Sequence, residues 1–352
     1  MGVIDADDLG VTLPHEHLLI DQTAYFIEPT EASERRLAHE PLSLETLYWV
    51  RPHFLGNVNN MKLTDEKLAI KEALLYKWAG GNTIVEMSNI GLHRDPLGLA
   101  RISRATGLNV IMGSGYYIGI SHPPELAIKT EEEIAQEIVR DIMVGVDNTG
   151  VRAGIIGEIG CSVPLTENEK KILRASAAAQ QRTGAALNIH PSFSHDILLE
   201  IIEILGGAGA DLSHTVISHC ELSCYNQDTY HRIAGAGCYI EFDNFGFPAI
   251  PIPDLISERG LISIPGTVWH IDEVKRLIEA GYLNQTLISH DICLKQHYVT
   301  YGGYGYAHIL RDVVPWMRKA HISDEQIHTL MVENPKRLLS FTPVKDREST
   351  HA

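Results

Sequence analysis

The 352-residue sequence contains no run of apolar residues long enough to cross a membrane, which takes about 18 to 20 consecutive apolar residues. The first ten residues, MGVIDADDLG, lack the basic start and apolar centre of a secretory signal peptide, so we expect a cytoplasmic protein. Basic residues are also scarce: the chain has 29 Lys and Arg but 45 Asp and Glu, which gives a formal net charge of −16. This balance argues against nucleic acid or an anionic membrane as the main partner, since both bind basic surfaces.

Cysteine is sparse as well, and its odd number excludes complete pairing into disulfides. The chain has five cysteines: Cys161, Cys220, Cys224, Cys238 and Cys293. Cys220 and Cys224 form a C-x-x-x-C pattern, but no second pair of cysteines would complete a structural zinc site. We therefore expect reduced, mostly buried thiols.

The pattern of apolar segments predicts an α/β fold. Eight short, largely apolar segments alternate with helical ones, and such strands are typical of a parallel sheet covered on both faces. Eight of them in one chain predict a (β/α)8 TIM barrel, a single domain over residues 1–344 with a polar tail at 345–352. An open doubly wound sheet is the alternative, but it would carry a G-x-G-x-x-G phosphate loop, and no such motif follows an early strand. The expected strands are Val11–Leu18, Thr83–Met87, Leu108–Met112, Gly154–Glu158, Ala186–His190, Thr215–His219, Cys238–Asp243 and Thr286–Asp291.

Capping signals and apolar periodicity predict the helices between these strands. Thr130 with Glu133 and Thr166 with Glu169 form capping boxes, and Thr64 stands where an N-cap is expected. Two connections are unusually long, and loops of this length are often functional. We expect 21–61 to be irregular and to wall the pocket, and the apolar, proline-rich 244–269 to be either a lid or a dimer contact. Further helices are expected at 96–106, 194–205, 307–319 and 323–339.

The strand at 11–18 carries an H-x-H pair. Because side chains alternate along a strand, His15 and His17 share one face and Glu16 lies on the other. Two imidazoles on one face can bind one metal ion, although such a pair alone proves little.

Later strands supply the partners that would make this pair meaningful. In a barrel the carboxyl ends of all strands meet on one rim, where the active sites of this fold lie. Four imidazoles and two carboxylates exceed what one catalytic zinc takes, so two metals with a bridging carboxylate fit better. Asp291 is the natural proton acceptor and donor. The six expected ligands are His15, His17, Glu158, His190, His219 and Asp291.

These residues and their surroundings resemble the phosphotriesterase family of the amidohydrolase superfamily, and most of all its phosphotriesterase-related branch. The similarity covers nearly the whole chain. It is carried by the motifs LPHEHL at 13–18, GEIGCS at 157–162, SHDI at 289–292, YGGYGY at 301–306 and ENPK at 333–336.

The resemblance implies two divalent metal ions per chain, most simply zinc, with manganese or cobalt also fitting the ligand set. By this likeness, His15, His17 and Asp291 hold the more buried ion, His190 and His219 hold the more exposed one, and Glu158 bridges them. True phosphotriesterases carry a carboxylated lysine at the bridge. Glutamate preserves an anionic bridge with two oxygens.

A second departure from the phosphotriesterases and one likeness to the lactonases bear on the substrate. The residues that relay a proton outward in the phosphotriesterases correspond here to Leu222 and Asn244, and neither can do so. Tyr117 aligns with a tyrosine near the metals in lactonase members, where it would either orient a carbonyl or simply pack.

We therefore expect a hydrolase for a small-molecule substrate. A metal-bound hydroxide would attack a carbonyl, as in an amide, an ester, a lactone or a small N-acyl amino acid, with Asp291 as general acid and base. The alternatives are a phosphoester or phosphotriester hydrolase with the same site, and an inert metal-containing barrel that binds a ligand. A homodimer is common in the family.

Overall fold

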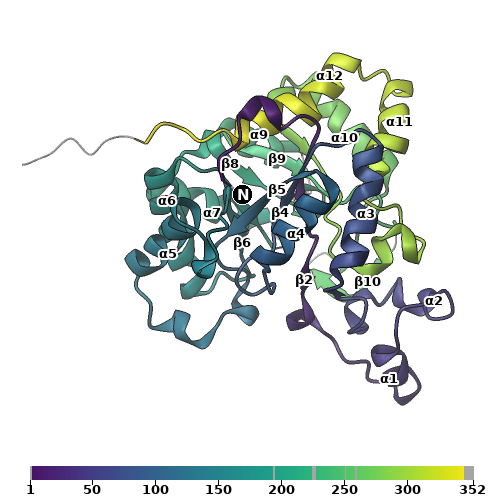
Figure 1. The fold of residues 1–352 in the computed structure, drawn as a ribbon. Coiled ribbons are helices and arrows are strands. Elements are labelled where there is room, and N and C mark those ends of the chain that lie inside the picture. The colour runs from purple at the N-terminus through teal and green to yellow at the C-terminus, as the bar shows by residue number, and fades with distance from the viewer. Residues whose placement is uncertain (1, 193–194, 224–226, 250, 258–259, 345–352) are drawn as a thin grey trace, which may run out of the picture.

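The structure of the chain is a computed structural model that describes residues 2–192, 195–223, 227–249, 251–257 and 260–344 (Figure 1). Ser194, Cys224 and the predicted polar tail at 345–352 lie outside the described residues. Within the described residues, no helix is long and apolar enough to span a bilayer. Cys161, Cys238 and Cys293 are free thiols, as expected.

Eight parallel strands form a nearly closed barrel, which confirms the predicted fold. Each strand pairs with the next along the chain, from β1 round to β12. The predicted segments all contain strands. Most strands are shorter than predicted, because the regular strand ends before the last residues of the predicted segment, as at Ile217 in β8 and Ile288 in β12. In barrel order the strands are β1 (Thr12–Glu16), β4 (Thr83–Glu86), β5 (Asn109–Ser114), β6 (Ile155–Gly160), β7 (Leu187–His190), β8 (Thr215–Ile217), β9 (Tyr239–Phe242) and β12 (Thr286–Ile288).

Helices surround this barrel (Figure 1). Both predicted capping boxes are present, at the starts of α5 and α6. Helix α3 (Glu66–Trp78) starts one residue later than expected, because the carboxylate of Asp65 rather than Thr64 caps the amides of Lys67 and Leu68. The main helices are α3 (Glu66–Trp78), α4 (Pro96–Thr106), α5 (Glu131–Met143), α6 (Glu167–Thr183), α7 (His195–Gly207), α8 (Cys220–Ser223), α9 (Gln227–Gly235), α10 (Thr267–Glu279), α11 (Val314–Lys319), α12 (Asp324–His328) and α13 (Asn334–Leu339).

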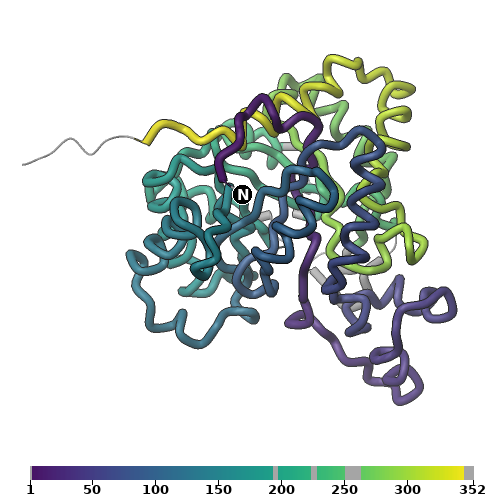
Figure 2. Tube along the Cα trace, viewed as in Figure 1, coloured from purple at the N-terminus to yellow at the C-terminus, as the bar shows by residue number. Residues whose placement is uncertain are grey.

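Strand residues alternate between two apolar clusters, as expected for a sheet that is buried on both faces. Ile84 and Ile156 belong to the cluster that also contains the buried faces of the helices. Their neighbours Val85 and Ile155 belong to a second cluster, which is completed by Leu338 of α13. The C-terminal segment therefore packs against the barrel, near the N-terminal residues (Figure 2).

Side chains from β1 and from the segment after β12 close the barrel. Glu16 accepts hydrogen bonds through Oε1 from Nδ1 of His290 at 2.8 Å and from the hydroxyl of Ser289 at 2.8 Å. Its second oxygen accepts from the amide of Ile292 at 2.9 Å. Glu16 and His290 thus satisfy each other, in agreement with their exclusion from the predicted ligand set.

The 21–61 segment is more regular than predicted. It contains α1 (Ala32–His39) and α2 (Leu47–Val50), which project from the barrel at the lower right of Figure 1. Its ends are drawn together because β2 (Ile20–Asp21) pairs antiparallel with β3 (Lys62–Leu63).

Two other segments also differ from the sequence prediction. The connection 244–269 contains a hairpin of β10 (Pro251–Ser257) and β11 (Gly260–Ser263), and its role as lid or dimer contact stays a prediction. The last two helices, predicted as continuous, include π-helical turns at Ile309–Val313 and Thr329–Glu333. Pro315 and Pro335 are the second residues after these turns, and proline lacks the amide that a regular helix needs there.

Candidate metal centre

The six predicted ligands converge at the carboxyl end of the barrel. His15 lies in β1 and His17 just beyond it, and their first group is completed by Asp291 from beyond β12. Nε2 of His17 lies 3.2 Å from Oδ1 of Asp291 and 3.3 Å from Oε1 of Glu158. Ligand atoms bound to one tetrahedral ion at ~2.1 Å lie roughly 3.4 Å apart, so this spacing suits a metal ion.

A second group forms on the other side of the same glutamate. Oε2 of Glu158 lies 3.0 Å from Nδ1 of His190 and 3.6 Å from Nε2 of His219. The two imidazole nitrogens are themselves 2.7 Å apart. Oε2 also lies 3.5 Å from Nε2 of His15, which belongs to the first group. The carboxylate of Glu158 therefore contacts imidazole nitrogens of both groups, and this position suits a bridging carboxylate.

The backbone places three of these side chains by unusual conformations. His219 and Asp291 adopt positive φ angles of 51° and 49°, just beyond strands β8 and β12. Such a conformation costs about 1–3 kcal/mol in a residue other than glycine, and it is concentrated at functional sites. Before Glu158, Gly157 has a φ of 147°, and a Cβ there would lie 2.8 Å from the carbonyl oxygen of Asn188. Only glycine fits at that position.

A layer of buried polar groups orients the imidazoles. Nδ1 of His17 lies 3.0 Å from the hydroxyl of Ser88, and Nδ1 of His15 lies 3.2 Å from Oε2 of Glu241. Because their Nδ1 atoms are engaged, both rings present Nε2 to the centre. Hydrogen bonds of this kind fix the tautomer and orientation of metal-binding histidines.

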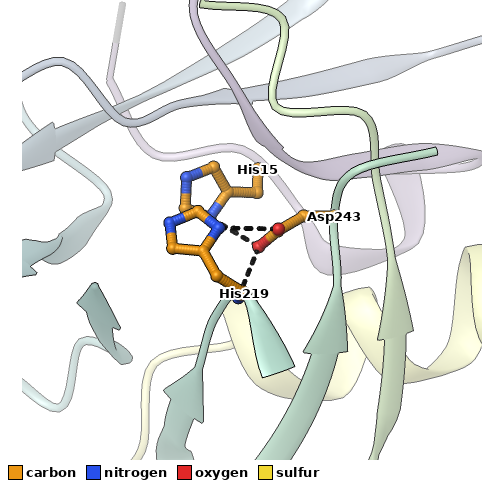
Figure 3. A group of neighbouring side chains, drawn as sticks. All are labelled: His15, His219 and Asp243. Atoms are coloured by element: carbon orange, nitrogen blue, oxygen red, sulfur yellow. Dashed lines mark hydrogen bonds and ion pairs between the residues drawn. The ribbon is translucent and has the colours of Figure 1, made fainter. Parts of the chain in front are cut away.

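Asp243 was missed by the sequence reasoning. Its carboxylate lies between two imidazoles, 2.7 Å from Nδ1 of His219 and 3.5 Å from Nδ1 of His15 (Figure 3). Its second oxygen also accepts from the backbone amide of His219 at 3.1 Å. Its position at the end of a predicted strand was the available signal, since every predicted ligand has such a position.

His15 shows that these residues fit a divalent cation. Its Nε2 is fully buried and has no hydrogen-bond partner among the described residues, although Oε2 of Glu158 is 3.5 Å away. A buried nitrogen lone pair without a donor is costly unless an ion or a proton occupies it. With nitrogen and carboxylate donors on both sides, the centre could hold two divalent ions.

The charges of the centre also favour cations. Although burial opposes protonation, the carboxylate of Glu158 raises the pKa of His15 well above its usual value. Burial likewise opposes ionisation of Glu158, but His15 and His190 hold the pKa of its carboxyl well below its usual range. The same residues that attract protons can therefore bind metal ions, which displace those protons.

Two tyrosines lie beside the more exposed group. The hydroxyl of Tyr117 is 3.2 Å from Nε2 of His190, and Tyr25 donates a hydrogen bond to it at 3.3 Å. Tyr25 comes from the 21–61 segment, so this segment does contribute a wall of the site. Burial raises the pKa of Tyr117 well above its usual value, so its hydroxyl stays protonated.

At the two positions where phosphotriesterases carry the proton relay, this chain has side chains that do not relay protons. Leu222 packs in an apolar cluster with Phe247 and Ile264. The side-chain amide of Asn244 donates to Oδ1 of Asp243 at 3.2 Å.

Comparison with known proteins agrees with this geometry. The phosphotriesterase family model matches residues 1–339. The chain belongs to the phosphotriesterase family. This family membership, with its hydrolase relatives, makes the chain a metal-dependent hydrolase of the amidohydrolase type.

The relatives of this phosphotriesterase-family chain match it over almost their whole length. An N-acetyltaurine hydrolase from Dictyostelium discoideum is 39% identical over 97% of this chain and 96% of its own. A phosphotriesterase-related protein from Nematostella vectensis is 39% identical over 97% of each chain. The crystal structure of a resiniferatoxin-binding protein from Rhodobacter sphaeroides superposes with a TM-score of 0.90 at 36% identity, covering 96% of this chain and 92% of that one.

Proposed function

We propose that this chain is a binuclear metal-dependent amidase that hydrolyses a small N-acetylated amino acid or amino sulfonate. The observation that carries the proposal is the position of Glu158, whose carboxylate lies within 3.6 Å of imidazole nitrogens from both groups of ligand atoms. His15, His17 and Asp291 would hold one ion, and His190 and His219 the other. Bound divalent ions would polarise the substrate carbonyl and lower the pKa of water.

Asp291 is the residue placed to move the proton. Its side chain is 15% exposed, whereas that of Glu158 is 2% exposed, so Asp291 can reach both water and substrate. In the reaction it would take one proton from the attacking water and give it to the amide nitrogen as the C–N bond breaks. The products are a carboxylic acid and a free amine.

Tyr117 would orient the substrate. Its protonated hydroxyl lies 3.2 Å from Nε2 of His190. The side chain of His190 is 16% exposed and, like that of Asp291, can be reached by a substrate. A carbonyl oxygen entering on this open side would accept a hydrogen bond from the phenol.

The amide is preferred over other substrates for two reasons. Relatives at 37–39% identity are named N-acetyltaurine hydrolases, and this chain matches them over 97% of its length. Leu222 and Asn244 also replace the proton relay of the phosphotriesterases, which supports a carbonyl substrate over a phosphotriester. Esters and lactones use the same groups and are secondary candidates.

Ligand binding without turnover is the second candidate, because the structurally similar Rhodobacter protein is named for a ligand it binds. The partly exposed carboxylate of Asp291 argues for turnover, because it reaches solvent as well as His17, and a binding protein has no need of a proton carrier there.

The test is a panel of N-acetyltaurine, N-acetyl amino acids, lactones, aryl esters and phosphotriesters, assayed with the metal-loaded protein. We expect turnover to be highest with the N-acetyl compounds and to fall by about 10²–10⁴-fold in Asp291→Asn. Asp324→Asn is the matched control, because this carboxylate is 75% exposed on α12 and pairs only with Arg318 among the described residues. A fully loaded protein that is inert to every compound would refute the proposal.

A further inference from the structure

A second cavity lies on the rim, away from the metal centre. This rim pocket has a volume of about 1010 Å³ and is bounded by the loop after β9, the start of α10 and the segment that follows β12. None of the six candidate metal ligands lines it, and neither does Tyr117. The lining residues that matter here are Phe247, Trp269, Gln296, His297, His308 and Trp316.

Six aromatic side chains contribute to its walls. The ring of Phe247 lies 4.0 Å from that of His297, and Trp316 lies edge-on to His308 at 5.8 Å. Trp269 belongs to the first turn of α10. Small-molecule sites are typically concave and aromatic, with a few polar groups that fix the ligand.

His297 supplies the first of these polar groups. It is 6% exposed, and neither ring nitrogen has a hydrogen-bond partner among the described residues. Burial lowers its pKa to about 4, so the ring is neutral at pH 7 and offers one N–H donor and one nitrogen acceptor. The adjoining cavity of about 10 Å³ has room for roughly one water, which could serve only one of the two nitrogens.

The other buried wall atoms that lack a hydrogen-bond partner among the described residues are acceptors. His308 directs Nδ1 to Asp312 at 2.8 Å, which leaves Nε2 as an unpartnered acceptor within the described part of the chain. Oε1 of Gln296 is buried and is likewise without a partner there. Besides the ring of His297, the buried unpartnered atoms that these two side chains present to a ligand are therefore acceptors.

Charges around the pocket do not favour an anion. Asp272 and Arg51 both line its exposed edge, so their charges offset each other. The carboxylate of Asp291 acts on His297 from the metal-centre side, in the direction that stabilises a positive charge. An anion would also bring only acceptors, and so would leave Nε2 of His308 and Oε1 of Gln296 without a partner.

We propose that the rim pocket is a second ligand site, which binds a neutral, ring-bearing molecule that donates a hydrogen bond, such as a phenol or an N–H heteroaromatic. Phe247 lines this pocket, packs on His297 and also belongs to the cluster with Leu222 and Ile264, whereas none of the six candidate metal ligands lines the pocket. The site is therefore distinct from the one that hydrolyses the substrate.

Isothermal titration of the full-length, metal-loaded protein with indole tests this proposal. Methylation of the indole nitrogen removes the donor without removing the rings, so 1-methylindole should bind about fivefold more weakly, as expected for one lost hydrogen bond. Indole-3-carboxylate keeps the donor and adds a negative charge, and it should also bind more weakly than indole. Equal affinity for all three probes, or no binding of indole, would overturn the assignment.

Three variants locate the site. His297→Phe keeps a ring but removes both nitrogens, and Trp316→Leu removes a wall that is 41% exposed and tolerant of change. Each should weaken indole binding by about tenfold. Trp78→Leu is the matched control, because Trp78 is 73% exposed at the end of α3, on the opposite rim. Loss of binding in Trp78→Leu alone would place the site elsewhere.

Asp291→Asn and substrate competition separate this proposal from the proposed function. Indole should bind Asp291→Asn as it binds the unaltered protein, even if no amide substrate is ever turned over. Competition between indole and N-acetyltaurine for one site would show that the pocket is part of the catalytic site, which would overturn the assignment of a second site.

Discussion

Oδ1 of Asp243 lies 2.7 Å from Nδ1 of His219, and the other oxygen of the same carboxylate accepts from the amide of His219. Both the ring and the backbone of this histidine are therefore held by one buried group. The pairing directs Nε2 of His219 toward Glu158 and His190. Burial raises the pKa of Asp243 to about 7, and His219 opposes that rise, so the pair depends on both members.

Asp243→Asn should weaken metal binding at the group formed by His190 and His219. An amide is uncharged and cannot hold the Nδ1–H of His219 as firmly, so we expect about 10- to 100-fold weaker affinity for one of two metal ions. Competition with a chromophoric chelator measures this affinity.

The control for that prediction is metal excess. Saturating zinc should restore most of the kcat of Asp243→Asn, because the residue positions a ligand and does not touch the substrate. An affinity equal to that of the unaltered protein would show that Asp243 is only structural.

Glu158→Gln should reduce the number of ions that bind. Glutamine has one oxygen acceptor and no charge, so it cannot bridge two groups of ligands, and we expect at most one of the two ions to remain after dialysis. Elemental analysis by mass spectrometry gives the count. Retention of both ions would mean that Glu158 is not the bridge.

Tyr117→Phe should reduce kcat/KM for an N-acetyl substrate by about tenfold while the metal content stays unchanged, as expected when one hydrogen bond to the substrate is lost. Tyr116→Phe is the matched control. Tyr116 is equally buried, but its hydroxyl bonds to Glu137 at 2.8 Å and to Lys129 at 2.9 Å, on the side of α5. Equal losses in both variants would indicate that Tyr117 simply packs.

The buried ring of His297 should make the chain less stable in acid. Its pKa is about 4 in the folded protein and about 6.5 in the unfolded chain. Between these values the unfolded chain binds the extra proton, so the free energy of unfolding falls as the pH drops from 6.5 to 4, by roughly 3 kcal/mol for this group. Urea unfolding of His297→Phe should show a weaker pH dependence over this range. A dependence identical to that of the unaltered protein would contradict the burial of a neutral imidazole.

The sequence predicted the barrel because its strands are continuously apolar and its helices carry local start signals, such as Thr130 with Glu133. These are short-range properties that survive folding. The regular parts of 21–61 were not predicted because α1 and α2 are only eight and four residues long. The strand pair that closes the segment joins residues 41 and 43 positions apart, which no local pattern reveals.

The candidate ligands of the site could also be predicted from the sequence, but not the groups around them. A strand-end position was enough to bring together the six expected residues, since the barrel places all strand ends on one rim. Glu241 was missed because its contact with His15 depends on which face of β9 turns inward, and that depends on tertiary packing. Asp243 had the same strand-end position as the predicted ligands and was overlooked. The rim pocket was equally hidden, since His297 is an ordinary loop histidine until its burial is known.

Metal titration of the demetallated protein, with activity followed at each addition, tests the central claim most directly. The account predicts that a chelator abolishes hydrolysis of N-acetyltaurine or an N-acetyl amino acid, and that activity returns in full only when about two equivalents of a divalent ion are bound. Full activity without bound metal, or full activity restored by a single equivalent, would contradict it.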